Sequence, residues 1–151
     1  MTQSDDDIIV SALSSITADQ WTHLHELAAA VDPHDPGGWL GGNVMSRTSE
    51  GKPVIAMPFY MYSRELNTLV ETLYSYNFVA PIAWGRWSER NGTKIIEMDA
   101  ATSSTTDLVK YIVTILRSDR FSEGYLGSEI RAGRFLTRLL AVIDRYRPAA
   151  T

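Results

Sequence analysis

Apolar residues recur at helical spacing along much of the chain, and each such stretch has its own start or stop signal. The first stretch follows Ser4 and has three aspartates in its first turn, where carboxylates complement the positive end of a helix. Ahead of the second stretch, Thr17 and Gln20 have the spacing of a capping box, and Pro33 follows its end. These signals predict two helices within residues 1–36.

Two longer apolar stretches lie in the middle of the chain. Ser63 precedes an amphipathic stretch, and Asn77 suits the left-handed position that closes such a helix. Ser104 precedes a stretch whose apolar residues cover most of the helix circumference. The second pattern indicates a central, buried helix.

The C-terminal part of the chain predicts two more helical segments after a turn at residues 118–122. Ser122 is placed to cap a helix toward Ala132, and Gly133 separates that helix from a final amphipathic one. Pro148 ends the last helix.

Short β-segments are predicted where the helical spacing fails. Residues 42–47 and 52–57 can pair around a turn at residues 48–51, with prolines that restrict them to sheet edges. The Asn91-Gly92 pair favours a second hairpin within residues 84–98. The whole pattern predicts a mainly α fold, a compact helical domain of about five or six helices with one or two small β-hairpins.

The length of 151 residues fits a single domain over residues 1–151, but the charge within it is uneven. Residues 1–36 hold seven acidic residues and neither lysine nor arginine, which makes them an acidic helical arm. Residues 107–151 hold eight basic and five acidic residues. We favour pairing of the acidic arm with this basic part, in the same chain or a neighbouring subunit, over a basic patch for an anionic partner.

Composition removes several classes of function. The chain has no cysteine, which excludes disulfides, thiolate metal sites and a cysteine nucleophile. No window approaches the ~18 consecutive apolar residues of a membrane span, and the acidic N-terminus is unlike a signal peptide. We therefore expect a cytoplasmic protein without a membrane partner.

The segment at residues 116–140, LRSDRFSEGYLGSEIRAGRFLTRLL, joins two apolar stretches through dense alternating charge. In a helix, Arg117, Arg120 and Glu123 would share one face. One interpretation is a pocket whose two guanidiniums bind a carboxylate or phosphate. We favour a structural interpretation, in which Asp119 and Glu123 pair with the arginines in a knot of salt bridges. That knot predicts that Arg120→Ala destabilises the fold.

The same segment resembles the signature of a prokaryotic domain family of unknown function, which has the pattern Arg-x-Asp-Arg-Phe-x-Glu-Gly. An upstream block is similar to the family's Pro-x-Tyr-x-Tyr, Leu-Tyr and Trp-x-x-Trp pattern. This chain has that pattern at Pro58, Tyr60, Tyr62, Leu73, Tyr74, Trp84 and Trp87. The resemblance covers roughly residues 39–146. It implies a single compact domain and transfers no mechanism.

Aromatic residues in the loops form a second candidate site. They can line a ligand groove or pack as lids over a helical core, and we favour the core interpretation. The set comprises Trp39, Tyr60, Tyr62, Trp84 and Trp87.

Two further patterns are weaker candidates. His23 and His25 are two residues apart on a predicted helix, so they point in different directions and cannot share a metal ion. Arg131, Arg134 and Arg138 form a stripe that could contact nucleic-acid phosphates, although we favour a solvated helix face.

The sequence contains no serine nucleophile elbow and no glycine-rich phosphate loop, and we identify no catalytic residue, metal or cofactor. It favours a small binding or protein-interaction module whose partner is another protein or a second copy in a homodimer. The alternative is an enzyme acting on an anionic small molecule, at a pocket formed by the charged junction and the loop aromatics. The candidate ligand-binding residues are Arg117, Asp119, Arg120, Glu123, Tyr60, Tyr62, Trp84 and Trp87.

Overall fold

A computed structural model of the protein describes residues 3–40, 44–55 and 58–148. In these ranges the chain forms eight helices and two two-stranded antiparallel sheets. The helices are α1 (Asp5–Ser14), α2 (Ala18–Ala30), α3 (Arg64–Ser75), α4 (Trp84–Asn91), α5 (Lys94–Glu97), α6 (Thr105–Ser118), α7 (Tyr125–Arg131) and α8 (Phe135–Tyr146). The strands are β1 (Gly37–Leu40), β2 (Val44–Arg47), β3 (Pro53–Ile55) and β4 (Phe59–Tyr62). The mainly helical prediction is confirmed, but the helices are more numerous than the five or six expected.

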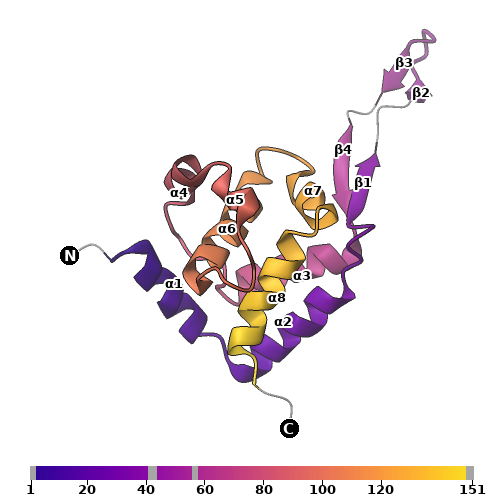
Figure 1. The fold of residues 1–151 in the computed structure, drawn as a ribbon. Helices are drawn as coiled ribbons and strands as arrows, with labels where there is room; N and C mark the ends of the chain where they lie inside the picture. The colour runs from indigo at the N-terminus through magenta and orange to yellow at the C-terminus, as the bar shows by residue number, and fades with distance from the viewer. Residues whose placement is uncertain (1–2, 41–43, 56–57, 149–151) are drawn as a thin grey trace.

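Helix α6 lies at the centre of the helical body, as its apolar circumference predicts (Figure 1). It buries both aliphatic and aromatic side chains, including the fully buried Tyr111. Helices α1, α4, α7 and α8 pack against it, and α2 packs against α3 and α8. One hydrophobic core results, and removal of its apolar surface from water is the main force that holds the helices together.

The predicted helix starts are confirmed by their hydrogen bonds. The Thr17 hydroxyl accepts a hydrogen bond from the Gln20 amide at 3.2 Å, and the Gln20 side chain accepts one from the Thr17 amide at 3.0 Å. Ser4, Ser63 and Ser104 likewise accept a bond from the amide three residues on. Each of these residues satisfies an amide that the helix itself leaves without a partner.

Two predicted local structures are wrong. Residues 84–98 form α4 and α5 rather than a hairpin, because Trp84, Trp87 and Ile95 pack on the core from a helical backbone. Gly92 ends α4 with φ of 43°, so the Asn-Gly signal marks a helix end here. Ser122 does not cap α7, since its N-cap is Gly124 in the left-handed conformation.

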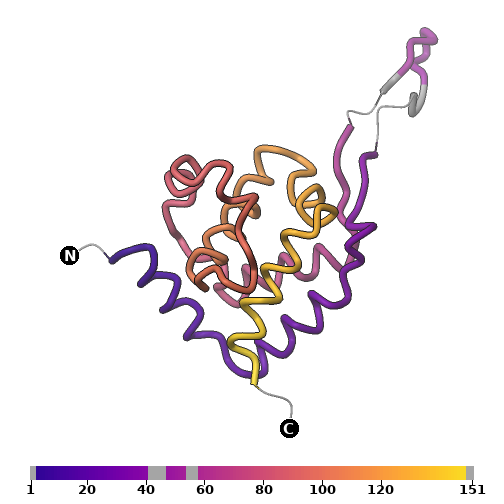
Figure 2. The backbone as a smooth tube through the Cα atoms, in the orientation of Figure 1, coloured from indigo at the N-terminus to yellow at the C-terminus, as the bar shows by residue number. Residues whose placement is uncertain are grey.

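The β-strands form a structure that extends from the helical body (Figures 1 and 2). In the first sheet, β1 pairs antiparallel with β4, and Trp39 lies opposite Tyr60. We call this pair the β1–β4 ribbon. In the second sheet, β2 pairs with β3. The predicted hairpin is therefore confirmed for residues 44–55, while its residues 42–43 and 56–57 lie outside the described residues.

The acidic helical arm packs on its own chain. Helix α1 buries Ile9 and Leu13 in the core, and Lys110 of α6 forms an ion pair with Asp6 at 2.6 Å. Asp5 accepts a hydrogen bond from the Ala83 amide at 3.2 Å, just before α4. None of the described helices is long and apolar enough to cross a membrane.

Candidate functional site

The junction between α6 and α7 holds strand β4 through its two carboxylates. Asp119 accepts a hydrogen bond from the Tyr62 hydroxyl and another from the Leu126 amide, at 2.9 Å. Glu123 accepts one from the Tyr60 amide at 3.1 Å. The carboxylates of the charged segment therefore bind both the β1–β4 ribbon and the start of α7. Their partners in the ribbon are distant in sequence, since Tyr62 is 57 residues from Asp119 and Tyr60 is 63 residues from Glu123.

Tyr62 is fixed as a hydrogen-bond donor. Burial of its ring raises the pKa of the phenol well above its usual range, and the hydrogen bond to Asp119 raises it further. The hydroxyl keeps its proton at every physiological pH, so the bond to Asp119 persists.

Tyr60 and Tyr62, on the inner face of the β1–β4 ribbon, pack against the start of α7, whereas Trp39 on the same face is 57% exposed. Trp39 and Tyr60 meet edge to face with ring centroids 5.3 Å apart, and Tyr60 lies 4.9 Å from the Tyr62 ring. Gly124 has φ of 82°, and a Cβ there would lie 3.0 Å from the Tyr60 ring. A Cβ on Gly127 would overlap the Tyr60 hydroxyl. Both glycines are thus required by the approach of the ribbon.

A third contact holds strand β1. Arg131, in the last turn of α7, donates a hydrogen bond to the carbonyl of Gly37 at 2.6 Å. Because Asp119 and Glu123 bind β4, both strands of the ribbon are fixed to α7 and the turn that precedes it.

The two arginines of the charged segment have a different environment from its carboxylates. The guanidinium carbons of Arg117 and Arg120 lie 5.4 and 5.5 Å from the centre of the same ring, that of Tyr74 in α3. In the part of the chain that the structure describes, neither arginine forms an ion pair. The predicted knot of salt bridges is therefore wrong, because the carboxylates bind the ribbon instead.

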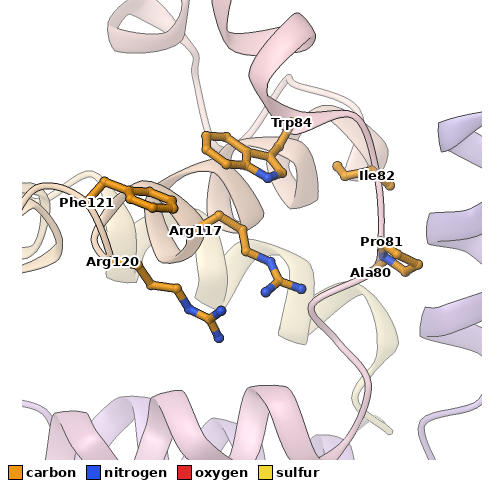
Figure 3. A pocket seen from close by; sticks show the side chains of 7 residues that line it. All are labelled: Ala80, Pro81, Ile82, Trp84, Arg117, Arg120 and Phe121. Carbon is orange, nitrogen blue, oxygen red and sulfur yellow. The ribbon is translucent and has the colours of Figure 1, made fainter.

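Both arginines line a pocket of about 400 Å³ between the end of α6 and the segment before α4. Figure 3 shows their side chains extending in the same direction, with the Trp84 ring beside Arg117. The lining residues are Ala80, Pro81, Ile82, Trp84, Arg117, Arg120 and Phe121. They include no carboxylate, imidazole or hydroxyl group, so the pocket is suited to hold an anion rather than to move a proton.

The predicted ligand-binding residues thus separate into three groups. Asp119, Glu123, Tyr60 and Tyr62 fix the ribbon. Arg117, Arg120 and Trp84 come together in the pocket. Trp87 lies apart from both, in a shallow depression of about 290 Å³ that Lys110 also lines.

Three residues of this region were not among the candidates. Phe121 lies inside the charged segment and is 84% exposed. An apolar residue surrounded by charged ones could have identified it from the sequence. Tyr74 entered the sequence analysis only through the Leu-Tyr part of the family pattern, and Ile82 carried no signal at all. Their roles depend on packing between α3, α4 and α6, which no local pattern records.

The solvated helix face that we favoured for Arg131, Arg134 and Arg138 is wrong for the ion-paired Arg134 and the buried Arg138, and these two do not form the alternative cationic stripe either. Arg134 pairs with Glu129, and Glu129 also accepts a hydrogen bond from Tyr111 at 3.0 Å. Arg138 is only 3% exposed, lies 4.3 Å above the Tyr111 ring, and donates to the carbonyls of Ile96 and Met98. These arginines hold α5 and α7 in place and offer no continuous cationic surface.

The outer face of the β1–β4 ribbon is apolar and exposed. Residues opposite each other in an antiparallel pair share a face, so Leu40 and Phe59 lie together, with Met61 next to them. These side chains are 47%, 41% and 52% exposed. Because Gly38 has no side chain, a groove of about 310 Å³ runs beside Leu40 and Met61.

Metal binding finds no support in the described residues. They contain no group of three histidine, aspartate or glutamate side chains placed to hold an ion.

Fold and site together define a mainly helical protein with a projecting β-ribbon and a separate cationic pocket. The chain belongs to DUF6508, a family of unknown function, whose model matches residues 16–148. The match includes the ribbon and the pocket and begins after α1. No curated protein and no solved structure matches the chain.

Proposed function

We propose that this protein is a protein-interaction module that associates with a second copy of itself through the outer face of the β1–β4 ribbon. The observation that carries this proposal is the exposure of Leu40, Phe59 and Met61 side by side on one face. The opposite face is fixed to α7, so the outer face is held in one orientation.

The exposed face has a physical cost that a partner would remove. Contiguous exposed apolar side chains on a soluble protein commonly mark an interaction site. Full burial of an exposed Leu, Phe or Met side chain stabilises by about 1.5–3 kcal/mol. These three side chains are about half exposed, so each would gain about half of that on association.

Charge does not oppose a second copy at this surface. The chain has a net charge of -4, so most approaches of two copies are repulsive. Leu40, Phe59, Met61 and Gly38 are uncharged, and of the residues that line the adjacent groove only Asp35 carries a charge. Two ribbons can therefore meet face to face around a two-fold axis, where each copy supplies the same surface.

Sedimentation equilibrium over a range of concentrations tests this proposal. We expect the wild type to show a reversible monomer–dimer equilibrium and Met61→Lys to remain monomeric, because burying an unpaired ammonium is costly. Val10→Lys is the matched control, since Val10 is 50% exposed on α1, far from the ribbon in sequence, and it should dimerise like the wild type. A wild type that is monomeric at every concentration would overturn the proposal.

A further inference from the structure

We propose that the pocket formed by Arg117, Arg120 and Trp84 binds a small molecule that carries a phosphate monoester on an aromatic ring. This site is separate from the ribbon surface and does not depend on the proposed self-association. The proposal is based on the charge, the shape and the aromatic lining of the pocket.

The two guanidiniums create an unbalanced positive charge. Their carbons lie 5.4 and 5.5 Å from the centre of the Tyr74 ring, and both side chains line the same pocket. The electron-rich face of the ring offsets part of their repulsion. An anion bound between them would offset the rest, and in the described residues no carboxylate does so.

Among the described residues, the arginines that donate side-chain hydrogen bonds do not include Arg117 or Arg120, so their N–H groups are available to a ligand. The N–H groups of a guanidinium form a planar fork. Such a fork matches the oxygens of a phosphate or carboxylate. Two forks suit a phosphate monoester best, because it has three terminal oxygens and a charge of about -1.5 to -2 at pH 7.

The other residues that line the pocket favour an aromatic ring on the ligand. Trp84 and Ile82 give the pocket an apolar wall, and Phe121 stands 84% exposed at its rim (Figure 3). A planar aromatic group between these side chains would cover Phe121 and gain stacking contacts. The volume of about 400 Å³ lies within the range of small-molecule sites.

The two arginines supply the formal charge of the pocket. Helix α4 begins beside it at Trp84, and Asp5 accepts the hydrogen bond of the preceding Ala83 amide.

Titration with phenyl phosphate, followed by the indole N–H resonance of Trp84 in NMR spectra, tests the proposal. The resonance is identified by its loss in Trp84→Phe. We expect a saturable shift, with affinity about tenfold or more weaker in Arg117→Gln and in Arg120→Gln. Arg64→Gln removes the same charge from an exposed position of α3 outside the pocket, and it should bind like the wild type.

Three further probes distinguish the parts of the ligand. Inorganic phosphate and phenol should each bind more weakly than phenyl phosphate, and benzoate should bind more weakly because it has one charge. No saturable shift, or equal weakening in Arg64→Gln, would overturn the site. Equal binding of phenol would show an apolar pocket only, and tighter binding of benzoate would contradict the phosphate assignment. The titration is run on Met61→Lys as well, so that a failure here stays distinct from a failure of the ribbon interface.

Discussion

At the scale of single residues, the charged segment between α6 and α7 divides its side chains between two tasks. Asp119 and Glu123 face β4 and hold it by hydrogen bonds. Arg117 and Arg120 face Tyr74 and the pocket. Neighbours in sequence therefore act on different elements, and substitutions within this segment should have very different effects on stability.

Asp119→Ala should lower the free energy of unfolding by about 1–3 kcal/mol, because it leaves both the Tyr62 hydroxyl and the Leu126 amide without an acceptor. Arg120→Ala should cost less than about 1 kcal/mol, since it removes one contact with an aromatic ring. Urea denaturation of both variants measures the difference. Asp144→Ala, which breaks only a surface ion pair, is the control. A larger loss of stability in Arg120→Ala than in Asp119→Ala would contradict this account and support the knot of salt bridges.

Stability should fall as the pH rises above about 10. Burial and the neighbouring Glu129 raise the pKa of Tyr111 far above its usual range, and burial also raises that of Tyr62 and Tyr125. The folded protein then keeps protons that the unfolded chain releases, so the stabilisation is complete below pH about 10 and is lost above it.

The fully buried Tyr111 adds a slope of about 1.4 kcal/mol per pH unit above pH 10. Urea denaturation of the wild type and of Tyr111→Phe at a series of pH values measures this slope. The variant should start less stable, because it loses the hydrogen bond to Glu129, and should show a shallower decline. Parallel curves for the two proteins would show that Tyr111 ionises normally when folded.

At the scale of elements, α7 is the support of the β1–β4 ribbon. The turn before α7 contacts β4 through Glu123, and the last turn of α7 contacts β1 through Arg131. Between them, Gly127 lets the Tyr60 ring approach the helix backbone. The short helix is itself held on α6 and α8 through the buried Leu126 and Ile130, so it links the ribbon to the core.

Two glycine-to-alanine substitutions should change stability in opposite directions. Gly85→Ala in α4 should stabilise by up to about 1 kcal/mol, because nothing lies near the added methyl group and alanine favours helix. Gly127→Ala in α7 should instead destabilise by about 1–3 kcal/mol, because the Tyr60 ring, whose hydroxyl is buried there, must move. Thermal melts compare the two, and a stabilised Gly127→Ala would mean that the ribbon does not pack there in solution.

The sequence was a good guide to elements whose signals are local. Capping residues such as Thr17 and Ser104 bond to amides three positions away, so their patterns reveal the helix starts directly. The Asn91-Gly92 pair misled because the same residues suit a hairpin turn and a helix end, and packing decided between them. The β1–β4 pairing was not predicted because it joins two short strands, residues 37–40 and 59–62, that are well separated in the sequence.

The sequence indicated which residues belong to the candidate site but not how they are arranged. Arg117, Arg120 and Trp84 were all candidates and do meet in one pocket. The partners of Asp119 and Glu123 lie 57 and 63 residues away, so the local spacing of charges suggested pairs that the tertiary fold replaces. The platform under the arginines is an aromatic ring from a third helix, which charge patterns do not indicate.

At the scale of the whole molecule, a helical body with a projecting β-ribbon (Figure 1) has two distinct surfaces. One is the cationic pocket beside α4 and α6, and the other is the apolar outer face of the ribbon. Helix α1, which precedes the family match, covers α6 through the Asp6–Lys110 ion pair and two buried side chains. Helix α1 therefore covers α6 in the helical body, whereas no described residue covers the outer face of the ribbon.

Because the sequence has no cysteine, a single introduced thiol reports directly on what meets the ribbon. The most direct measurement is the yield of covalent dimer from Met61→Cys with a short bifunctional maleimide, at dilutions where random collisions contribute little. Val10→Cys, equally exposed on α1, is the control. We predict efficient dimer formation for Met61→Cys and almost none for Val10→Cys. Equal yields from the two variants, or no dimer from either, would contradict a self-associating ribbon.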